Sequence, residues 1–368
     1  MATRLAEGYT ERAAAALQLL AGERLDALLV LDLLNVRYLC GFTGSNGLLV
    51  LLGDRRVFFT DSRYTLQARE ETVGVEVVET ADLDRSAAGV LSTGGARYVG
   101  FQPTSITAAR RARLGRLLEA DLVDVGTGVD RLRVCKGPDE TRRLEAAARL
   151  AEEALRFVAP LLCPGRTELE VARAFHVACL ERGAEGLSFD TIVAGGPRGA
   201  LPHAKPTGRP FEAGDLVLVD FGVRLDGYCS DQTVTVPVGP PAEDAAQVYG
   251  VVFQAQRAAL EALRPGVALA EVDRAARDVI AAAGHGERFG HGTGHGVGLA
   301  VHEAPTVSSR SGDAAQEGAV VTIEPGIYLP GRFGVRLEDT VRVTSHGYER
   351  ITSVPKELGA FWDWVGGR

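Results

Sequence analysis

The stretch Leu162-Cys-Pro-Gly-Arg-Thr-Glu-Leu-Glu-Val-Ala-Arg173 returns 101 residues later as Leu263-Arg-Pro-Gly-Val-Ala-Leu-Ala-Glu-Val-Asp-Arg274. Over the longer windows 154–183 and 255–284, ten of the thirty positions are identical without a gap. The Pro-Gly step ends one helix, and Thr167 with Glu170 forms a capping box that starts the next. We therefore expect a duplicated helix–turn–helix unit, with each copy followed by strands.

Acidic residues follow the first copy in a strand–turn–strand pattern. Asp220 and Asp231 flank a turn that we expect to be centred near Leu225-Asp226, which would place the two carboxylates almost opposite each other. Asp226 itself reads as a solvated or ion-paired acid of the turn.

A similar acidic pair follows the second copy. Glu324 and Glu338 flank the Gly/Pro-rich segment 325–334, and a strand is expected over 335–343. Alternation along that strand places Asp339 on the face opposite Glu338. Each half thus brings two carboxylates toward a shared centre. Carboxylates that face one another raise each other's pKa and stay ionised only beside cations. The alternative is that these acids are solvated or paired with arginines.

Histidines supply a second signal for a metal or catalytic site. His291, His295 and His302 lie in Gly290-His-Gly-Thr-Gly-His-Gly-Val-Gly-Leu-Ala-Val-His-Glu303, and His203 precedes the first acidic hairpin. Glycine stands at every second position from 290 to 298. This pattern lets the backbone approach another group closely, and we expect that group to be a metal or a substrate.

Four carboxylates with one imidazole form a hard, oxygen-rich ligand set. Such a set suits Mn²⁺, Fe²⁺ or Co²⁺, with Zn²⁺ as a further option. Two ions would share the negative charge, and a bound water would become acidic enough to attack a carbonyl carbon. The residues therefore predict a metal-dependent hydrolase.

The rest of the chain sets the context of this site. It has 368 residues and a net charge of −8, so we expect no nucleic-acid partner. The sequence has no run of about 18 uncharged apolar residues, so we expect no membrane span. Five scattered cysteines without a C-x-x-C motif favour a reducing, cytoplasmic location. Alternating strand and helix patterns predict an α/β N-terminal domain over 1–134, and the duplicated unit falls in 135–368.

Several motifs resemble those of the pita-bread metallopeptidases, which include methionine aminopeptidase, prolidase and aminopeptidase P. They are Asp220-Phe-Gly with Asp231, Gly294-His-Gly-Val-Gly-Leu with His302, Ile323-Glu-Pro-Gly-Ile-Tyr, and Val335-Arg-Leu-Glu-Asp. The segment Asn35-Val-Arg-Tyr-Leu-Cys-Gly-Phe-Thr-Gly-Ser45 is similar to the N-terminal domain of the Xaa-Pro branch. The resemblance implies a creatinase-like α/β domain followed by an α+β pita-bread domain with pseudo-twofold duplicated halves.

The resemblance also implies roles for individual residues. The dinuclear metal ligands would be Asp220, Asp231, His295, Glu324 and Glu338. Of these, Asp231 and Glu338 would bridge two ions, with Mn²⁺ as the first choice, and Glu324 would also act as general base. The substrate-side residues would be His203, His291, His302 and Arg336, although Arg336 could equally serve only to balance the acids. Relatives further suggest a homodimer.

The implied activity is hydrolysis of the bond between an N-terminal residue and a following proline. Within this class, the short N-terminal domain favours an aminopeptidase P that accepts dipeptides and longer peptides, because the cleft would stay open. A strict Xaa-Pro dipeptidase, or prolidase, is the alternative. A pita-bread scaffold that binds a partner or works without metal is a further alternative, but such relatives lose metal ligands and this sequence keeps all five.

Overall fold

The computed structural model describes residues 2–367, and the chain separates into two compact units between Arg133 and Val134. Each unit has its own sheets and its own hydrophobic core. Among the described residues, no helix combines the length and the apolar character that a membrane span requires.

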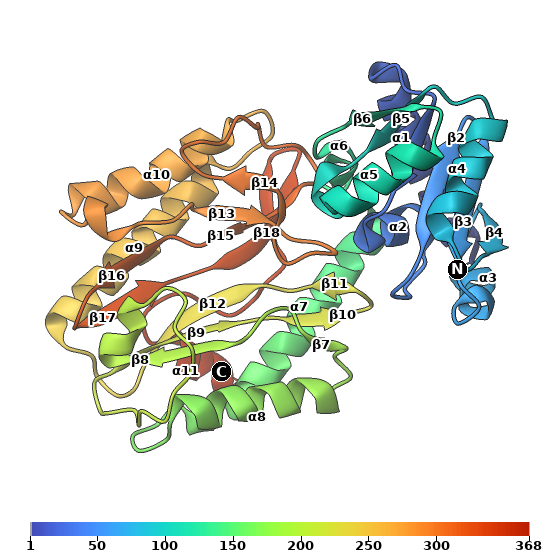
Figure 1. The fold of residues 1–368 in the computed structure, drawn as a ribbon. Helices are drawn as coiled ribbons and strands as arrows, with labels where there is room; N and C mark the ends of the chain where they lie inside the picture. The colour runs from blue at the N-terminus through green and yellow to red at the C-terminus, as the bar shows by residue number, and fades with distance from the viewer. Residues whose placement is uncertain (1, 368) are drawn as a thin grey trace. The chain divides into compact units, whose positions relative to one another are not determined.

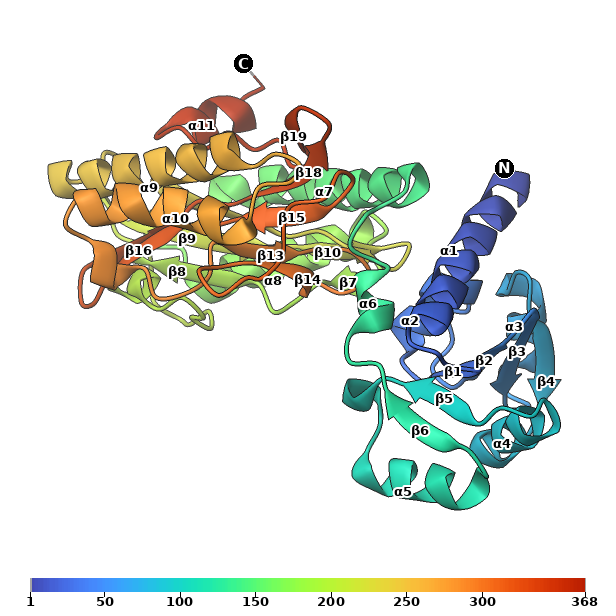
Figure 2. The same cartoon turned by 90° about the horizontal axis from the view of Figure 1, so that it is seen from above.

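The first unit is a six-stranded mixed sheet in the order β4-β3-β2-β1-β5-β6. Its strands are β1 (Ala27–Val30), β2 (Leu48–Leu52), β3 (Arg55–Thr60), β4 (Glu76–Glu79), β5 (Tyr98–Phe101) and β6 (Asp121–Asp124). Its helices are α1 (Ala2–Gly22), α2 (Leu33–Cys40), α3 (Thr65–Glu71), α4 (Leu83–Thr93), α5 (Ala108–Leu117) and α6 (Gly128–Arg131), with a short 3₁₀ turn, η1 (Pro103–Ser105). Helices α1 and α2 cover one face and α4 and α5 the other (Figure 2). This confirms the α/β class expected for the N-terminal domain.

The second unit contains two halves of similar construction. In the first half, α7 (Pro138–Val158) and α8 (Glu168–Glu181) precede the sheet β12-β9-β8; in the second, α9 (Glu243–Ala262) and α10 (Leu269–Ala282) precede the sheet β14-β13-β15-β18-β19. Figure 1 shows α9 and α10 over the strands of the second half, and α7 and α8 beside those of the first. This arrangement confirms the duplicated pita-bread domain.

The strands of the second unit are two to six residues long. They are β7 (Gly186–Leu187), β8 (Ile192–Gly195), β9 (Leu216–Phe221), β10 (Val223–Leu225), β11 (Tyr228–Cys229), β12 (Gln232–Pro237), β13 (Gly294–Gly296), β14 (Glu303–Val307), β15 (Val320–Ile323), β16 (Gly326–Leu329), β17 (Phe333–Arg336), β18 (Asp339–Thr344) and β19 (Gly347–Arg350). The remaining elements are η2 (Ala159–Leu161), η3 (Gly196–Ala200), η4 (Gly286–Arg288) and α11 (Ala360–Val365).

The repeated Pro-Gly step has the same backbone geometry in both halves. Gly165 and Gly266 adopt positive φ angles of 86° and 84°, a region that glycine enters without steric cost. After the first step, Thr167 and Glu170 form the predicted capping box at the start of α8. The same local signals therefore turn the chain between paired helices twice.

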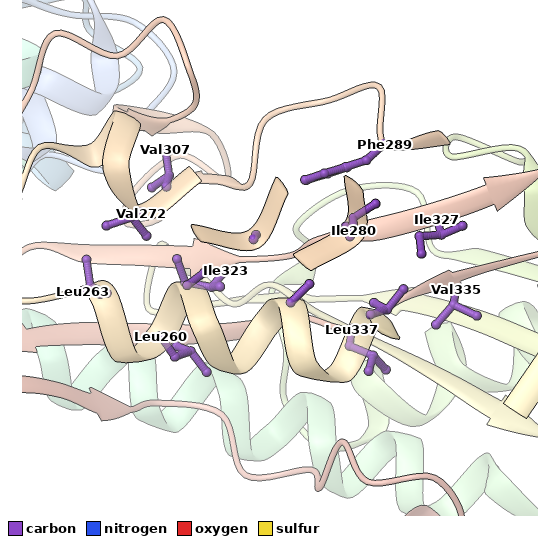
Figure 3. Packing of buried hydrophobic residues seen from close by; sticks show 14 of the residues in the cluster. Leu260, Leu263, Val272, Ile280, Phe289, Val307, Ile323, Ile327, Val335 and Leu337 are labelled. Atoms are coloured by element: carbon purple, nitrogen blue, oxygen red, sulfur yellow. The ribbon is translucent and has the colours of Figure 1, made fainter. Parts of the chain in front are cut away.

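Each half has a separate apolar core. Helices α7 and α8 pack on β9 and β12 through Leu155, Phe175 and Phe221, whereas α9 and α10 pack on the second sheet. Figure 3 shows Leu260 of α9 and Ile280 of α10 within the second core. These cores fix the ends of the strands from which the acidic residues project.

The predicted register of the first acidic hairpin is wrong by two residues. Asp220 lies opposite Thr233 instead of Asp231. The turn is centred on Asp226-Gly227, where both residues have positive φ angles of 48° and 76°, as a two-residue type I′ turn requires. Because the error is an even number, Asp231 still lies on the same face of the hairpin as Asp220.

The strand predicted over 335–343 is interrupted. It consists of β17, which ends at Arg336, and β18, which begins at Asp339, and the two belong to different sheets. Ile323 pairs with Asp339 in the β15–β18 ladder, so Glu324 and Glu338 come at the next position on either side. The break frees the backbone amide of Glu338, which donates to the carbonyl of Thr233 at 3.1 Å.

Truncation of the second core should destabilise the unit strongly. Ile280→Ala should cost about 2–5 kcal/mol, because Ile280 is fully buried and the cavity would not collapse completely. For a unit of this size, that cost lowers the thermal midpoint by roughly 5–15 °C. Leu180→Ala removes an isomeric side chain from the last turn of α8, where Leu180 is 49% exposed, and serves as the control. Equal midpoints for the two variants would contradict the packing described.

Candidate metal centre and active site

The nine site residues predicted from the sequence line one cavity of about 580 Å³ in the second unit. Asp220 projects from β9, Asp231 directly precedes β12, and His295 lies in the middle of β13. Glu324 follows β15 and Glu338 precedes β18. His203, His291, His302 and Arg336 come from the surrounding loops and from the end of β17. Both halves of the repeat therefore contribute to a single site.

His295 is the imidazole at the centre of this cluster. Its Nε2 atom lies 3.3 Å from Oε1 of Glu324 and 3.6 Å from Oδ2 of Asp231. Its Nδ1 atom donates to the carbonyl of Gly296 at 3.1 Å. Although burial opposes the charged ring, the hydrogen bond to Glu324 and the nearby carboxylates raise the pKa of His295, so a proton on Nε2 fills the place between these oxygens that a metal cation could take instead.

Arg336 compensates part of the negative charge. Its Nη2 atom donates to Oδ2 of Asp220 at 2.5 Å, and its Nε atom donates to Oγ1 of Thr233 at 3.1 Å. Thr233 in turn donates to Oε2 of Glu338 at 2.7 Å. The arginine thus reaches one ligand candidate directly and a second one through a hydroxyl group.

One arginine does not neutralise the whole cluster. Burial raises the pKa of Asp220, of Asp231 and of Glu338, and neighbouring carboxylates raise each pKa further. Burial acts in the same direction on Glu324, but the hydrogen bond and charge of His295, together with Arg336, outweigh it and lower the pKa of that carboxyl. The cluster is therefore short of positive charge.

Two buried carboxylate oxygens show where that charge is missing. Oδ1 of Asp220 and Oε1 of Glu338 have no hydrogen-bond partner among the described residues. Buried acceptors of this kind are costly unless a cation or a donor reaches them. The donor set of this site consequently fits hard divalent ions.

The ligand atoms fall into overlapping groups of three. The groups are Asp220–Asp231–Glu338, His295–Glu324–Glu338, and Asp231–His295–His302, each with its atoms within 4.8 Å of one another. Glu338 belongs to the first two groups, and Asp231 belongs to the first and third. His295 belongs to the second and third groups, and His302, which was expected on the substrate side, also enters the third.

The remaining histidines surround the cluster on the cavity side. The ring of His302 packs edge-on against that of His295, with centroids 4.3 Å apart. Burial lowers the pKa of His291, and its Nδ1 atom lies 2.8 Å from the carbonyl of Gly292. His291 is thus a neutral ring whose Nε2 atom is an acceptor.

Sequence reasoning missed Tyr328, which connects two of the predicted residues. Its hydroxyl accepts from Nη1 of Arg336 at 2.9 Å and lies 2.8 Å from Nε2 of His291, to which it donates. Tyr328 ends the quoted motif Ile323-Glu-Pro-Gly-Ile-Tyr, so its position in that motif was the available signal. The side chain aligns the arginine and the histidine on one wall of the cavity.

The glycines beside His295 have a different cause from the one predicted. A Cβ atom at Gly294 would lie 1.9 Å from the carbonyl oxygen of Thr322, and one at Gly296 would lie 2.2 Å from that of Ala304. At Gly298 it would lie 2.2 Å from Oε1 of Glu303. The expectation of close approach to a metal or substrate was wrong for these three glycines, because neighbouring protein atoms occupy the space.

Gly298 makes room for a buried ion pair. Oε1 of Glu303 lies 2.7 Å from Nζ of Lys136, and both side chains are almost completely buried. Glu303 directly follows His302, so this pair fixes the strand start from which the histidine projects.

Two further acids near these segments, Asp226 and Asp339, lie outside the metal cluster. Asp226 is in the turn, whereas Asp339 is buried and paired with Arg350 and Lys356.

Comparisons with known proteins identify the family to which the chain belongs. Residues 142–345 match metallopeptidase family M24, and residues 12–135 match the creatinase/prolidase N-terminal domain. The chain is 43% identical over 336 residues to the uncharacterized peptidase YqhT of Bacillus subtilis (strain 168), covering 91% of this chain and 95% of the relative.

Two solved structures are similar over nearly the whole length. The Xaa-Pro dipeptidase from Bacillus anthracis has a TM-score of 0.92 and 36% identity, covering 95% of this chain and 99% of that one. The X-Pro aminopeptidase from Thermotoga maritima MSB8 has a TM-score of 0.85 and 34% identity, covering 91% and 97%. The chain belongs to metallopeptidase family M24. It is a metallopeptidase, which confirms the predicted family and enzyme class.

A methyl group at Gly298 should disrupt the strand start that carries His302. Gly298→Ala would push the Glu303 carboxylate away from Lys136, and breaking a buried ion pair costs about 3–5 kcal/mol. Gly290→Ala is the matched control, since a Cβ atom there meets nothing within 4 Å. Thermal unfolding of both variants should show a large loss only for Gly298→Ala, and a wild-type midpoint for that variant would refute the packing.

Proposed function

We propose that this metallopeptidase hydrolyses the bond between an N-terminal residue and a following proline. The observation that carries the proposal is the shared cavity, in which five ligand-type side chains converge beside three further histidines and Arg336. The names of the Bacillus anthracis and Thermotoga maritima relatives, both Xaa-Pro peptidases, support the same bond specificity.

The proposed metal ligands are Asp220, Asp231, His295, Glu324 and Glu338. As the resemblance implies, Asp231 and Glu338 would each serve both ions, since each belongs to two of the overlapping ligand groups and a carboxylate, unlike the imidazole of His295, has two oxygens to offer. Divalent ions, with Mn²⁺ as the first choice, would supply Lewis acidity and lower the pKa of a bound water.

The other steps would fall to side chains of the chain itself. Glu324 would accept the proton of the attacking water as the oxygen bonds to the carbonyl carbon, and that proton would reach the proline nitrogen as the C–N bond breaks. His302 would donate a hydrogen bond to the carbonyl oxygen, because its ring lies against that of His295 and faces the cavity. His203, His291 and Arg336 would hold the groups around the proline.

We further propose that the enzyme acts as an aminopeptidase that accepts Xaa-Pro dipeptides and longer peptides. The Thermotoga maritima relative is an X-Pro aminopeptidase. Strict Xaa-Pro dipeptidase activity is the second candidate, and the name of the Bacillus anthracis relative favours it. We also propose a cytoplasmic homodimer, on the basis of the scattered cysteines and of the resemblance respectively.

Removal of a bridging carboxylate should affect metal binding and turnover together. Asp231→Asn or Glu338→Gln should lower kcat by about three orders of magnitude, because a catalytic ion supplies several kcal/mol of transition-state stabilisation. The metal-depleted parent should be inactive, and Mn²⁺ or Co²⁺ should restore activity. Mn²⁺ should also raise its thermal midpoint by roughly 5–10 °C at a hundred times Kd.

The control for this experiment is Asp226→Asn, which changes a carboxylate of the same hairpin to a residue that tolerates a positive φ. It should keep wild-type metal content and kcat. Full activity of the parent after dialysis against excess chelator would contradict the metal-dependent mechanism, and so would a near-wild-type kcat for Glu338→Gln.

Peptide length separates the two candidate activities. The parent, loaded with Mn²⁺, should cleave Xaa-Pro-Xaa tripeptides with a kcat/KM at least equal to that for Xaa-Pro dipeptides. Release of the N-terminal residue can be followed by mass spectrometry, with matched Xaa-Ala-Xaa peptides as controls. Turnover of dipeptides alone would establish strict dipeptidase activity instead. Equal cleavage of the alanine peptides would show that the enzyme does not require proline at the second position.

A further inference from the structure

Glu168 is a fully buried carboxylate outside the cavity. It opens helix α8, and both of its oxygens accept hydrogen bonds from the last residue of β8 and from the segment that follows it. The donors are the backbone amide of Gly195 at 3.0 Å, Nε of Arg198 at 2.9 Å, and both the amide and the hydroxyl of Thr207 at 2.8 Å each. One side chain thus holds the beginning and the end of the segment 195–207.

This segment is the one that carries His203 to the cavity. Residues 202–206 line the cavity in an unbroken run. Arg198, besides pairing with Glu168, donates through Nη2 to the carbonyl of Lys205 at 2.6 Å, so the ion pair reaches into the middle of the run. The position of His203 therefore depends on a carboxylate that does not line the cavity itself.

The second half contains a corresponding arrangement. Asp273 of α10 is fully buried and accepts from the amide and the hydroxyl of Thr293 at 3.1 and 2.8 Å. It also accepts from Nε of Arg277 at 2.6 Å. Arg277 donates in turn to the carbonyl of Phe289 at 3.0 Å and to the carbonyl of His291. The pair spans the segment 289–293, which carries His291.

The two arrangements are alike in design but differ in position. Glu168 is the first residue of α8, whereas Asp273 lies in the second turn of α10. In both, the second helix of the repeated unit supplies a buried carboxylate, and an arginine forms an ion pair with it. The loop held by this pair presents one histidine to the cavity. None of the four residues is among those that line the cavity.

We propose that the pairs Glu168–Arg198 and Asp273–Arg277 are positioning pairs, which set the catalytic efficiency by holding His203 and His291 in place. The inference rests on the proposed function, since it takes these histidines as the groups that hold the substrate. Each pair would act through its histidine. The loop held by Asp273–Arg277 also touches a proposed metal ligand, since the carbonyl of Thr293 accepts from the amide of Glu324 at 2.7 Å, so the pair Glu168–Arg198 gives the cleaner test. Misplacement of a substrate-holding group by about 1 Å can cost up to about 100-fold in rate.

The first experiment compares Glu168→Gln with the parent and with a matched control. Glu168→Gln should lower kcat/KM for an Xaa-Pro substrate by roughly 10- to 100-fold, while bound Mn²⁺ per chain stays at the parent value. The control is Glu170→Gln, which makes the same change in the same helical turn, where Glu170 bonds only Arg166 and Thr167 within the described contacts. This control should keep the parent kcat/KM.

A double-mutant cycle tests whether the loss of kcat/KM in Glu168→Gln acts through His203. In a His203→Asn background, Glu168→Gln should cause less than about a threefold further loss, because the positioned group is already absent. The same cycle with Asp273→Asn and His291→Asn tests the second pair. A full multiplicative loss in these backgrounds would overturn the proposal, because a general structural defect would act independently of the histidine.

Hydrogen exchange gives a readout that does not depend on activity. In Glu168→Gln, amides of residues 196–207 should exchange faster by at least tenfold, while those of β13 and β15 keep the parent rate; in Asp273→Asn the change should fall on 289–293. If the parent cleaves no Xaa-Pro peptide, the proposed function fails, and this measurement still decides whether the pairs hold the loops. Unchanged exchange in both segments would overturn the proposal.

A conservative variant covers the case in which Glu168→Gln does not fold. Arg198→Lys keeps the charge beside Glu168 but cannot donate at once to Glu168 and to the Lys205 carbonyl as the guanidinium does. It should show the same faster exchange over 196–207 and a smaller loss of kcat/KM. Parent values for both quantities would count against the pair.

Discussion

The structure depends on the burial of like charges. Asp231 and Glu338 are 4% and 2% exposed, and each has further carboxylates beside it. Removing an ion from water costs several kcal/mol even after relaxation, so such a cluster is stable only when counter-charges are built in or bound. Arg336 supplies one built-in charge. The remaining deficit is a place for bound cations, as expected for a member of this metallopeptidase family.

This cluster lies across the seam between the two halves, and threonine side chains close that seam. Thr233 and Thr235 of β12 bond Glu338 and the carbonyl of Arg336 at 2.7 and 2.9 Å, and Thr340 of β18 donates to the carbonyl of Asp231 at 2.7 Å. The hydroxyls of Thr233 and Thr235 also accept from Arg336, at 3.1 and 3.2 Å, so each of them both donates to and accepts from the second half. The ligands of the two halves are therefore set relative to one another by threonine hydrogen bonds before any ion binds.

Local sequence signals were sufficient to predict the repeat, the paired helices and the residues that line the cavity. They were not sufficient for the hairpin register, because the type I′ turn at Asp226-Gly227 moves the pairing by two positions from the expected centre. The even shift, set by the period of two along a strand, is what kept Asp231 on the predicted face.

Contacts between residues far apart in the sequence could not be predicted from local patterns. Tyr328 aligns Arg336 with His291, and Glu168 holds a segment that ends 39 residues later at Thr207. Neither contact has a periodic or local signature, since each forms only after the sheets and loops have packed. A single sequence shows which side chains can ligate a metal more readily than it shows which ones hold those side chains in place.

The crowded glycines around His295 bear on how distant relatives should be read. Thr322, Ala304 and Glu303 exclude any side chain at the three positions, whether or not an ion is bound nearby. A homologue that had abandoned hydrolysis would still need the same small residues to assemble this sheet. The glycines of the Gly294-His-Gly-Val-Gly298 signature therefore report the architecture, whereas His295 and the four carboxylates are the residues whose loss would mark a relative that no longer hydrolyses peptides.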